Sequence, residues 1–79
     1  MMYSDGIHLI SDQGIDDLHI QCQKLGIKRC WFHNGGGGRF PHYDIPKLKR
    51  KTFFEDHPTV KKVTGRDIVK ILKGESIEQ

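Results

Sequence analysis

The sequence predicts a small α/β domain in which a three-stranded, mainly parallel sheet carries three helices in the order β-α-β-α-β-α. Short runs of β-branched and aromatic residues alternate with segments whose apolar residues recur at helical spacing. Strands that alternate with helices favour a parallel sheet with right-handed crossovers. The 79 residues leave room for one domain, so we expect a single unit over 1–79 with a frayed tail at 75–79.

The first strand and the first helix are expected in the N-terminal third. Residues 1–4, "MMYS", suit a short strand that an Asp-Gly turn pair ends. Residues 7–12, "IHLISD", are either extended or a loop. From Asp12, a favourable N-cap, apolar residues recur at helical spacing until Gly26 ends the helix. These apolar residues are Ile15, Leu18, Cys22 and Leu25.

The second strand and helix are expected on either side of a glycine run. Residues 27–32, "IKRCWF", suit a strand, and the glycines at 35–38 end it. Asp44 can cap a helix with a proline in its first turn, and the pattern continues to residue 56, before a His-Pro pair.

The third strand and helix complete the predicted fold. Residues 59–63, "TVKKV", are the strand candidate. Thr64 and Asp67 have the spacing of a capping box, and the helix that follows them ends at Gly74.

Charge is distributed unevenly along the chain. Thirteen Lys and Arg residues against ten Asp and Glu residues give a net charge of +3. Acidic residues gather in the first third, whereas the run "KLKRK" at 47–51 is basic. This separation favours a positive surface that attracts a phosphate, a nucleotide or a nucleic acid; a solvated helix face is the alternative.

The cysteine count and the hydropathy pattern narrow the class of protein. Two cysteines, Cys22 and Cys30, exclude a disulfide scaffold, and we expect both to be reduced, buried thiols. No apolar run approaches the about 20 residues that span a bilayer, and the N-terminus lacks a signal-peptide pattern. We expect a soluble cytoplasmic protein without a membrane partner. Because so short a chain has a thin core, we also expect a homo-oligomer.

Ligands of open α/β sheets bind at the carboxyl ends of the strands. The predicted strands place the stretch 33–44, "HNGGGGRFPHYD", at that edge. Its glycines would let backbone N–H groups approach a ligand, and Arg39 would add a positive charge; a mobile surface loop is the alternative. Trp31 and Tyr43 offer flat faces to a base, although Trp31 also suits the core. Phosphates have candidate partners in Arg39, Lys47 and Arg50.

The five histidines form none of the usual metal-binding spacings. His8, His42 and Asp44 would nevertheless meet at the predicted edge as a His/His/carboxylate set that suits zinc, manganese or iron. Without a metal, the same residues are candidates for acid-base catalysis. His19 is either part of a ligand site or a structural histidine. No cofactor is predicted outright, and a divalent metal remains the alternative. No serine or cysteine nucleophile stands beside these groups, which disfavours covalent acyl transfer.

Six motifs resemble a bacterial and phage family that is catalogued only as a domain of unknown function, numbered four thousand and thirty-one. The motifs are "HLISD" at 8–12, "DDLH" at 16–19, "LGI" at 25–27, "WF" at 31–32, "HYDIP" at 42–46 and "GRDIVKIL" at 65–72. The resemblance covers nearly the whole chain. It implies that the family shares His8, Asp12, His19, His42, Tyr43 and Asp44. It implies no activity, and the glycine run departs from the family's pattern.

Three functions follow from these observations. The leading prediction is a small protein that binds an anionic, nucleotide-like or phosphate-bearing molecule. In a phage, such a protein would sequester that molecule. The residues predicted to bind it are His8, His19, Arg39, His42, Tyr43, Asp44 and Lys47. The alternative is a phosphoesterase or nuclease that uses His8, His42 and Asp44 as metal ligands or acid-base groups, so catalysis stays open. Nucleic-acid binding through the basic face ranks last, because the net charge is modest and no nucleic-acid motif is visible.

Overall fold

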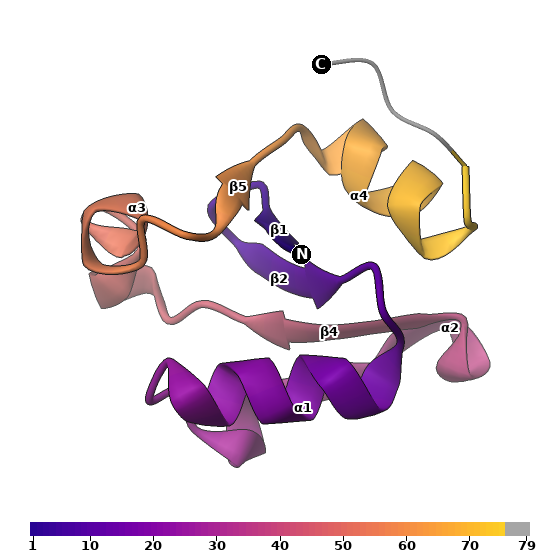
Figure 1. The fold of residues 1–79 in the computed structure, drawn as a ribbon, viewed down its shortest axis with the longest axis horizontal. Coiled ribbons are helices and arrows are strands. Elements are labelled where there is room, and N and C mark those ends of the chain that lie inside the picture. Colours follow the sequence, from indigo (N-terminus) through magenta and orange to yellow (C-terminus); the bar gives the residue numbers. More distant parts are fainter. Residues whose placement is uncertain (76–79) are drawn as a thin grey trace.

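The computed structural model describes residues 1–75, which form a five-stranded mixed sheet with helices packed against it (Figure 1). The strands are β1 (Met2–Ser4), β2 (His8–Ser11), β3 (Phe32–Asn34), β4 (Phe40–Asp44) and β5 (Lys61–Lys62). The helices are α1 (Ile15–Lys24), α2 (Gly35–Gly38), α3 (Phe53–Asp56) and α4 (Gly65–Leu72), with 3₁₀ turns η1 (Arg29–Trp31) and η2 (Lys47–Lys49). The strand order is β3-β4-β2-β1-β5.

The prediction of a three-stranded, mainly parallel sheet is wrong. The pairs β1–β2, β2–β4 and β3–β4 are antiparallel, and β1–β5 is the parallel pair within the described residues. The error comes from residues 8–11 and 40–44, which form strands although the sequence left them open or assigned them to a loop. Gly6, with a φ of +97°, reverses the chain after β1. Because a tight turn joins antiparallel neighbours directly, β1 and β2 need no crossover helix.

The glycine run connects β3 and β4 into a hairpin. The pairing places His33 opposite His42, and a further bridge joins Gly35 to Phe40. Gly37 and Gly38 have φ values of +67° and +93°, a backbone conformation that other residues rarely adopt. The glycines therefore give this connection its turn, and they set which residues of the two strands face each other.

The predicted second helix is replaced by η2 and the short helix α3. The basic run at 47–51 offers one apolar side chain, Leu48, and that side chain is 97% exposed. A helix without an apolar face gains little from packing, so the segment breaks into short turns. The predicted strand at 27–32 is likewise mostly η1, and only its last residue enters β3.

The first and last predicted helices are present as α1 and α4. The residue at the N-cap of α1 is Gly14, so the prediction that Asp12 caps this helix is wrong. The capping box of α4 is confirmed. The Asp67 N–H donates to Thr64 Oγ1 over 3.1 Å, and the Thr64 N–H donates to Asp67 Oδ2 over 3.2 Å.

The two faces of the sheet have different chemistry. Leu9 and Tyr43 are paired across β2 and β4, and they pack with Leu18 and Cys22 of α1 in the main core. Because side chains alternate along a strand, the neighbouring residues point to the opposite face, where α4 lies. Cys22 is buried as predicted, whereas Cys30 is exposed, because its segment forms a 3₁₀ turn and not a strand.

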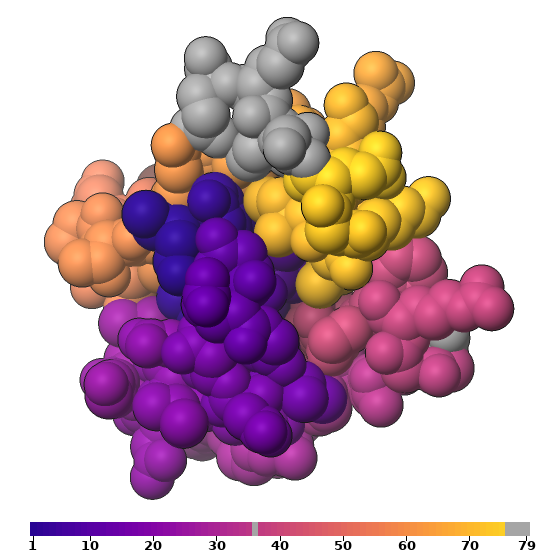
Figure 2. All heavy atoms as spheres, turned by 45° about the vertical axis from the view of Figure 1, so that its right-hand side comes forward, coloured from indigo at the N-terminus to yellow at the C-terminus, as the bar shows by residue number. Residues whose placement is uncertain are grey.

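The opposite face is partly covered by α4. Ile68 of this helix is buried, and Leu72 lines a hollow together with Gly38 and Arg39 from the end of the hairpin. Figure 2 shows α4 (yellow) and this hairpin (pink) as neighbours on the molecular surface. Within residues 1–75, no helix has the length and apolar character needed to cross a membrane. Apart from its first residue, the tail predicted at 75–79 lies outside the described residues.

Candidate metal centre

Four polar residues of β2, β3 and β4 share the face of the sheet that α4 partly covers. His8 on β2 lies opposite Asp44 on β4, and His33 on β3 lies opposite His42 on β4. His42 and Asp44 are two residues apart on β4, so both side chains point to the same face. The antiparallel register therefore brings together His8, His42 and Asp44, which the sequence analysis had expected to meet at the edge of a parallel sheet.

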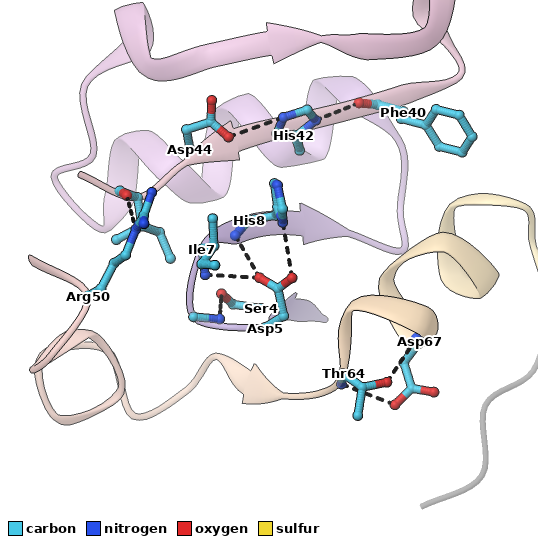
Figure 3. Close-up of polar contacts among 12 residues, drawn as sticks. Ser4, Asp5, Ile7, His8, Phe40, His42, Asp44, Arg50, Thr64 and Asp67 are labelled. Atoms are coloured by element: carbon cyan, nitrogen blue, oxygen red, sulfur yellow. Dashed lines mark hydrogen bonds and ion pairs between the residues drawn. The ribbon is translucent and has the colours of Figure 1, made fainter. Parts of the chain in front are cut away.

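The side chains are close enough to act on one ion or one ligand (Figure 3). One potential ligand atom from each of His8, His42 and Asp44 lies within 4.8 Å of the others. The rings of His8 and His42 meet edge to face, with centroids 5.2 Å apart. Asp44 Oδ1 lies 3.2 Å from His42 Nε2, and Asp44 Oδ2 lies 3.0 Å from His33 Nε2. Asp44 thus stands between two imidazoles.

The backbone fixes the tautomer of His42. Its Nδ1 lies 2.7 Å from the carbonyl oxygen of Phe40. A carbonyl oxygen only accepts hydrogen bonds, so Nδ1 of His42 carries the proton and donates it. In the neutral ring, Nε2 is then left with its lone pair directed toward Asp44.

Asp5 fixes His8 in the same way. Asp5 Oδ1 accepts hydrogen bonds from the N–H groups of Ile7 (2.9 Å) and His8 (2.7 Å), and Asp5 Oδ2 lies 3.0 Å from His8 Nδ1 (Figure 3). Burial raises the pKa of Asp5, but the hydrogen bonds from His8 and Ile7 outweigh it and hold the pKa below its ordinary value. The ionised carboxylate accepts a hydrogen bond from the His8 Nδ1–H, which in the neutral ring leaves the lone pair of His8 Nε2 available to a metal.

Two hydrogen-bond acceptors consequently face each other at 3.2 Å, the Nε2 of neutral His42 and the carboxylate of Asp44. Such a pair is repulsive unless a positive charge lies between or beside the two atoms. That charge is either a second proton on His42 or a metal cation. Metal-binding histidines usually donate their other ring N–H to a carboxylate or a backbone carbonyl, and His8 and His42 do so here.

The centre opens into a pocket of about 180 Å³. Asp5, His8 and His42 line its polar side, and the apolar side is formed by Phe40 and by residues of α4, Ile68, Val69 and Leu72. The side chains of His8 and Asp44 are 42% and 40% exposed, so solvent or a small molecule reaches the cluster.

Two further residues predicted to bind a ligand lie on the other face of the sheet. Tyr43 is 1% exposed, and its hydroxyl group lies 2.7 Å from Nδ1 of His19. The His19 ring also meets Phe32 edge to face, with centroids 4.6 Å apart. His19 and Tyr43 therefore form a partly buried contact between α1 and the sheet, separate from His42, and they line a hollow together with Arg29.

The predicted cationic residues are not part of the cluster either. Arg39 lines a different hollow, of about 350 Å³, together with Ser11 and Leu18. Lys47 is exposed in η2, beyond the end of β4. The glycines of the hairpin form its turn, and the first of them, Gly35, lies beside the His42 ring.

The site residues predicted from the sequence leave out two members of the cluster, Asp5 and His33, although both fall at the expected edge of the sheet. An Asp three residues before a His can bond both the turn and the ring, which would have pointed to Asp5. His33 would have been found from the hairpin: if the glycines connect two strands, residues equally distant from the turn face each other.

Comparisons with known proteins give a family and no function. No curated protein matches the chain, and no solved structure matches it. A family model described as a protein of unknown function, DUF4031, matches residues 3–75. The resemblance noted from the motifs is confirmed, and the chain is a member of the DUF4031 family.

Proposed function

We propose that the protein binds a divalent transition metal through His8, His42 and Asp44 and uses it to hydrolyse a phosphoester. The observation that carries the proposal is the position of the His42 ring, whose Nδ1 is held by the Phe40 carbonyl and whose Nε2 lies 3.2 Å from Asp44 Oδ1. A cation bound there would replace an unfavourable contact between two acceptors with two coordination bonds. Nitrogen from two imidazoles and oxygen from one carboxylate suit zinc, iron or manganese.

The geometry of the three donors supports a site that is open to a further ligand. In a tetrahedral site with bonds of about 2.0 Å the ligand atoms lie about 3.3 Å apart. The three candidate atoms lie within 4.8 Å of each other, so rotations of the side chains are enough to close the set. Three protein ligands leave at least one position for water, as in catalytic zinc sites.

The chemistry of a water molecule at such a metal is hydrolysis. A bound zinc ion lowers the pKa of its water to about 7, and the ion also polarises a phosphoryl oxygen. His33 contacts Asp44 and is 59% exposed, which suits it to exchange protons with solvent. Acid-base catalysis by His8, His42 and Asp44 without a metal is the competing mechanism, and it predicts activity in the presence of a chelator.

Metal content is the direct test. Untagged protein is to be analysed for bound metals and then titrated with Zn²⁺ and Mn²⁺ in a calorimeter. We expect one ion per chain for the wild type and for His57→Gln, a change at a histidine outside the cluster, and no binding above trace level for His42→Ala or Asp44→Asn. Equal binding by His42→Ala and His57→Gln would contradict the proposal.

Turnover separates the metal mechanism from the acid-base alternative. A chromogenic phosphodiester is to be incubated with the apoprotein and with the metal-loaded protein. We expect hydrolysis in the presence of metal, its loss on chelation, and its return when metal is added back. Turnover that a chelator leaves unchanged would favour acid-base catalysis. No turnover by fully metal-loaded protein would contradict the proposed hydrolase activity and leave only the proposed metal binding.

The other properties predicted from the sequence differ in what the structure offers them. Homo-oligomerisation, a cytoplasmic location and nucleic-acid binding by the basic face have no observation here that favours them. Binding of a nucleotide-like molecule has one, and it concerns another pocket of the molecule.

A further inference from the structure

A second pocket, of about 250 Å³, lies where the chain leaves β4. Its aromatic walls are Trp31 and Phe53, and its polar groups include those of Lys49, Asp56 and His57. We call it the Trp31 pocket. A mainly apolar cavity with a few converging polar groups is typical of small-molecule sites, and this volume lies just below their usual lower limit of about 300 Å³. The pocket therefore suits one flat ring system.

The rim of the Trp31 pocket is positively charged. The Nζ atoms of Lys28 and Lys49 lie 6.0 Å and 5.7 Å from the centroid of the Trp31 ring. Both lysines are exposed, so their ammonium groups are available to a ligand in solvent. Because the two ammonium groups lie over the same ring, an anionic group next to that ring is attracted by both of them.

The wall of the pocket also carries a hydrogen-bond acceptor. Asp56 lines it, and an ionised carboxylate only accepts hydrogen bonds. This carboxylate would repel a phosphate inside the pocket, whereas the exocyclic amino group of a nucleobase is a donor that carboxylates recognise. The aromatic walls are suited to the face of the same base.

We propose that the Trp31 pocket binds a nucleoside monophosphate whose base carries an amino group. The base lies against Trp31 with its amino group toward Asp56, and the phosphate lies outside, at Lys28 and Lys49. This site is distinct from the metal centre, because neither His8 nor His42 lines it and the Asp44 carboxylate points to His33 and His42 on the other face of the sheet.

The fluorescence of Trp31 tests the proposal directly, because the chain has a single tryptophan. AMP, adenosine, ribose 5-phosphate, UMP and inorganic phosphate are to be titrated into the wild-type protein in the presence of a chelator. We expect AMP to change the emission saturably with a Kd below about 1 mM. Adenosine and UMP should bind about tenfold more weakly, since one lacks the phosphate and the other the amino group.

Each part of the inference has its own contradicting result. No saturable change with AMP up to about 10 mM would overturn the site. Adenosine binding as tightly as AMP would overturn the role of the lysines, and UMP binding as tightly as AMP would overturn recognition by the Asp56 carboxylate. Inorganic phosphate competing as well as AMP would indicate an anion site without a base pocket.

A matched pair of lysine variants distinguishes a built site from general attraction by the basic run. Lys49→Ala removes a cation that lines the pocket, and Lys51→Ala removes an exposed cation of the same run outside it. We expect Lys49→Ala to weaken AMP binding about tenfold and Lys51→Ala to change it less than twofold, roughly the scale of one charge-assisted hydrogen bond against a screened surface charge. Equal losses would contradict the proposal.

The two proposals fail separately. His8→Ala leaves every residue of the Trp31 pocket in place, so it should abolish metal binding and keep the AMP response. AMP binding that is lost in His8→Ala would contradict two distinct sites. Metal binding without any AMP response would remove the nucleotide inference and leave the proposed metal centre standing.

Discussion

Replacing Asp5 with asparagine tests whether this residue controls the metal centre or only the turn before β2. Asp5 accepts two backbone N–H groups through Oδ1 and the His8 Nδ1–H through Oδ2. An asparagine keeps one accepting oxygen and gains an amide NH₂, which only donates. If the oxygen stays on the backbone, the NH₂ faces His8 Nδ1, and the imidazole must move its proton to Nε2.

The magnitude follows from that change of tautomer. A proton on His8 Nε2 occupies the atom that would bind the metal, so metal affinity should fall about 10- to 100-fold, the usual effect of losing an outer partner of a metal ligand. The two backbone bonds lose their charge assistance, worth about 1 kcal/mol each, so the free energy of unfolding should fall by about 2 kcal/mol.

Zinc titration against a chromophoric chelator measures the affinity, and ¹⁵N NMR of the histidine ring reports the tautomer of His8. Asp67→Asn is the matched control, because Asp67 also accepts a backbone N–H, in the capping box of α4, and touches no histidine of the cluster. It should lower stability by about 1 kcal/mol and leave zinc affinity unchanged. An Asp5→Asn protein that is less stable but binds zinc like the wild type would refute our account.

Three further predictions concern the other face and the core. Burial lowers the pKa of His19 below its ordinary 6.5, so NMR should find this ring titrating below that pH. The contribution of His19 to the free energy of unfolding is then fully present above pH 6.5. It falls as the pH drops below 6.5, because the unfolded chain binds a proton that the folded chain does not yet bind. Burial raises the pKa of Cys22 to about 12, so a thiol reagent should modify Cys30 quickly and Cys22 only on unfolding. In denaturant titrations, Leu9→Ala should cost about 3 kcal/mol, whereas Leu48→Ala, at a 97% exposed side chain, should stay within about 0.5 kcal/mol; equal effects would contradict the assigned core.

Some elements of this fold could be predicted because their signals are local. The capping box at Thr64 and the spacing of Ile15, Leu18 and Cys22 identify two helices without any tertiary information. Whether two strands are joined by a crossover or by a turn is a tertiary property. The sequence "IHLISD" at 7–12 alternates too weakly to reveal that Leu9, Ile10 and the strand around them are buried at the centre of the sheet.

Three residues of the candidate site were correctly predicted to lie together, but the strand arrangement that brings them together was not predicted. His8, His42 and Asp44 were expected together because three parallel strands would end at one edge, and they lie together because β2 and β4 pair antiparallel with His8 opposite Asp44. The sequence also predicted that His19 and Tyr43 bind the ligand, but the alternation of side chains along β4 places Tyr43 on the α1 face. Which face a residue occupies depends on strand register, which a single sequence does not state.

The same register implies that metal binding and folding are coupled. His8 comes from β2 and His42 and Asp44 come from β4, so an ion bound by all three would join the two central strands of a sheet whose core is thin. At a zinc concentration of 100 times Kd the folded state gains about 2.7 kcal/mol, provided the unfolded chain binds none. For a domain of this length, that gain raises Tm by about 10–20 °C.

Thermal unfolding followed by circular dichroism measures this coupling, with a chelator and with zinc. The rise in Tm should be absent in His42→Ala and retained in His57→Gln, which keeps the cluster intact. The zinc-dependent gain should also be smaller in His33→Ala, because His33 orients Asp44 and is not among the three ligands. A rise of equal size in His42→Ala would mean that zinc stabilises the chain elsewhere, and the pairing of His8 with Asp44 would then be a feature of the sheet alone.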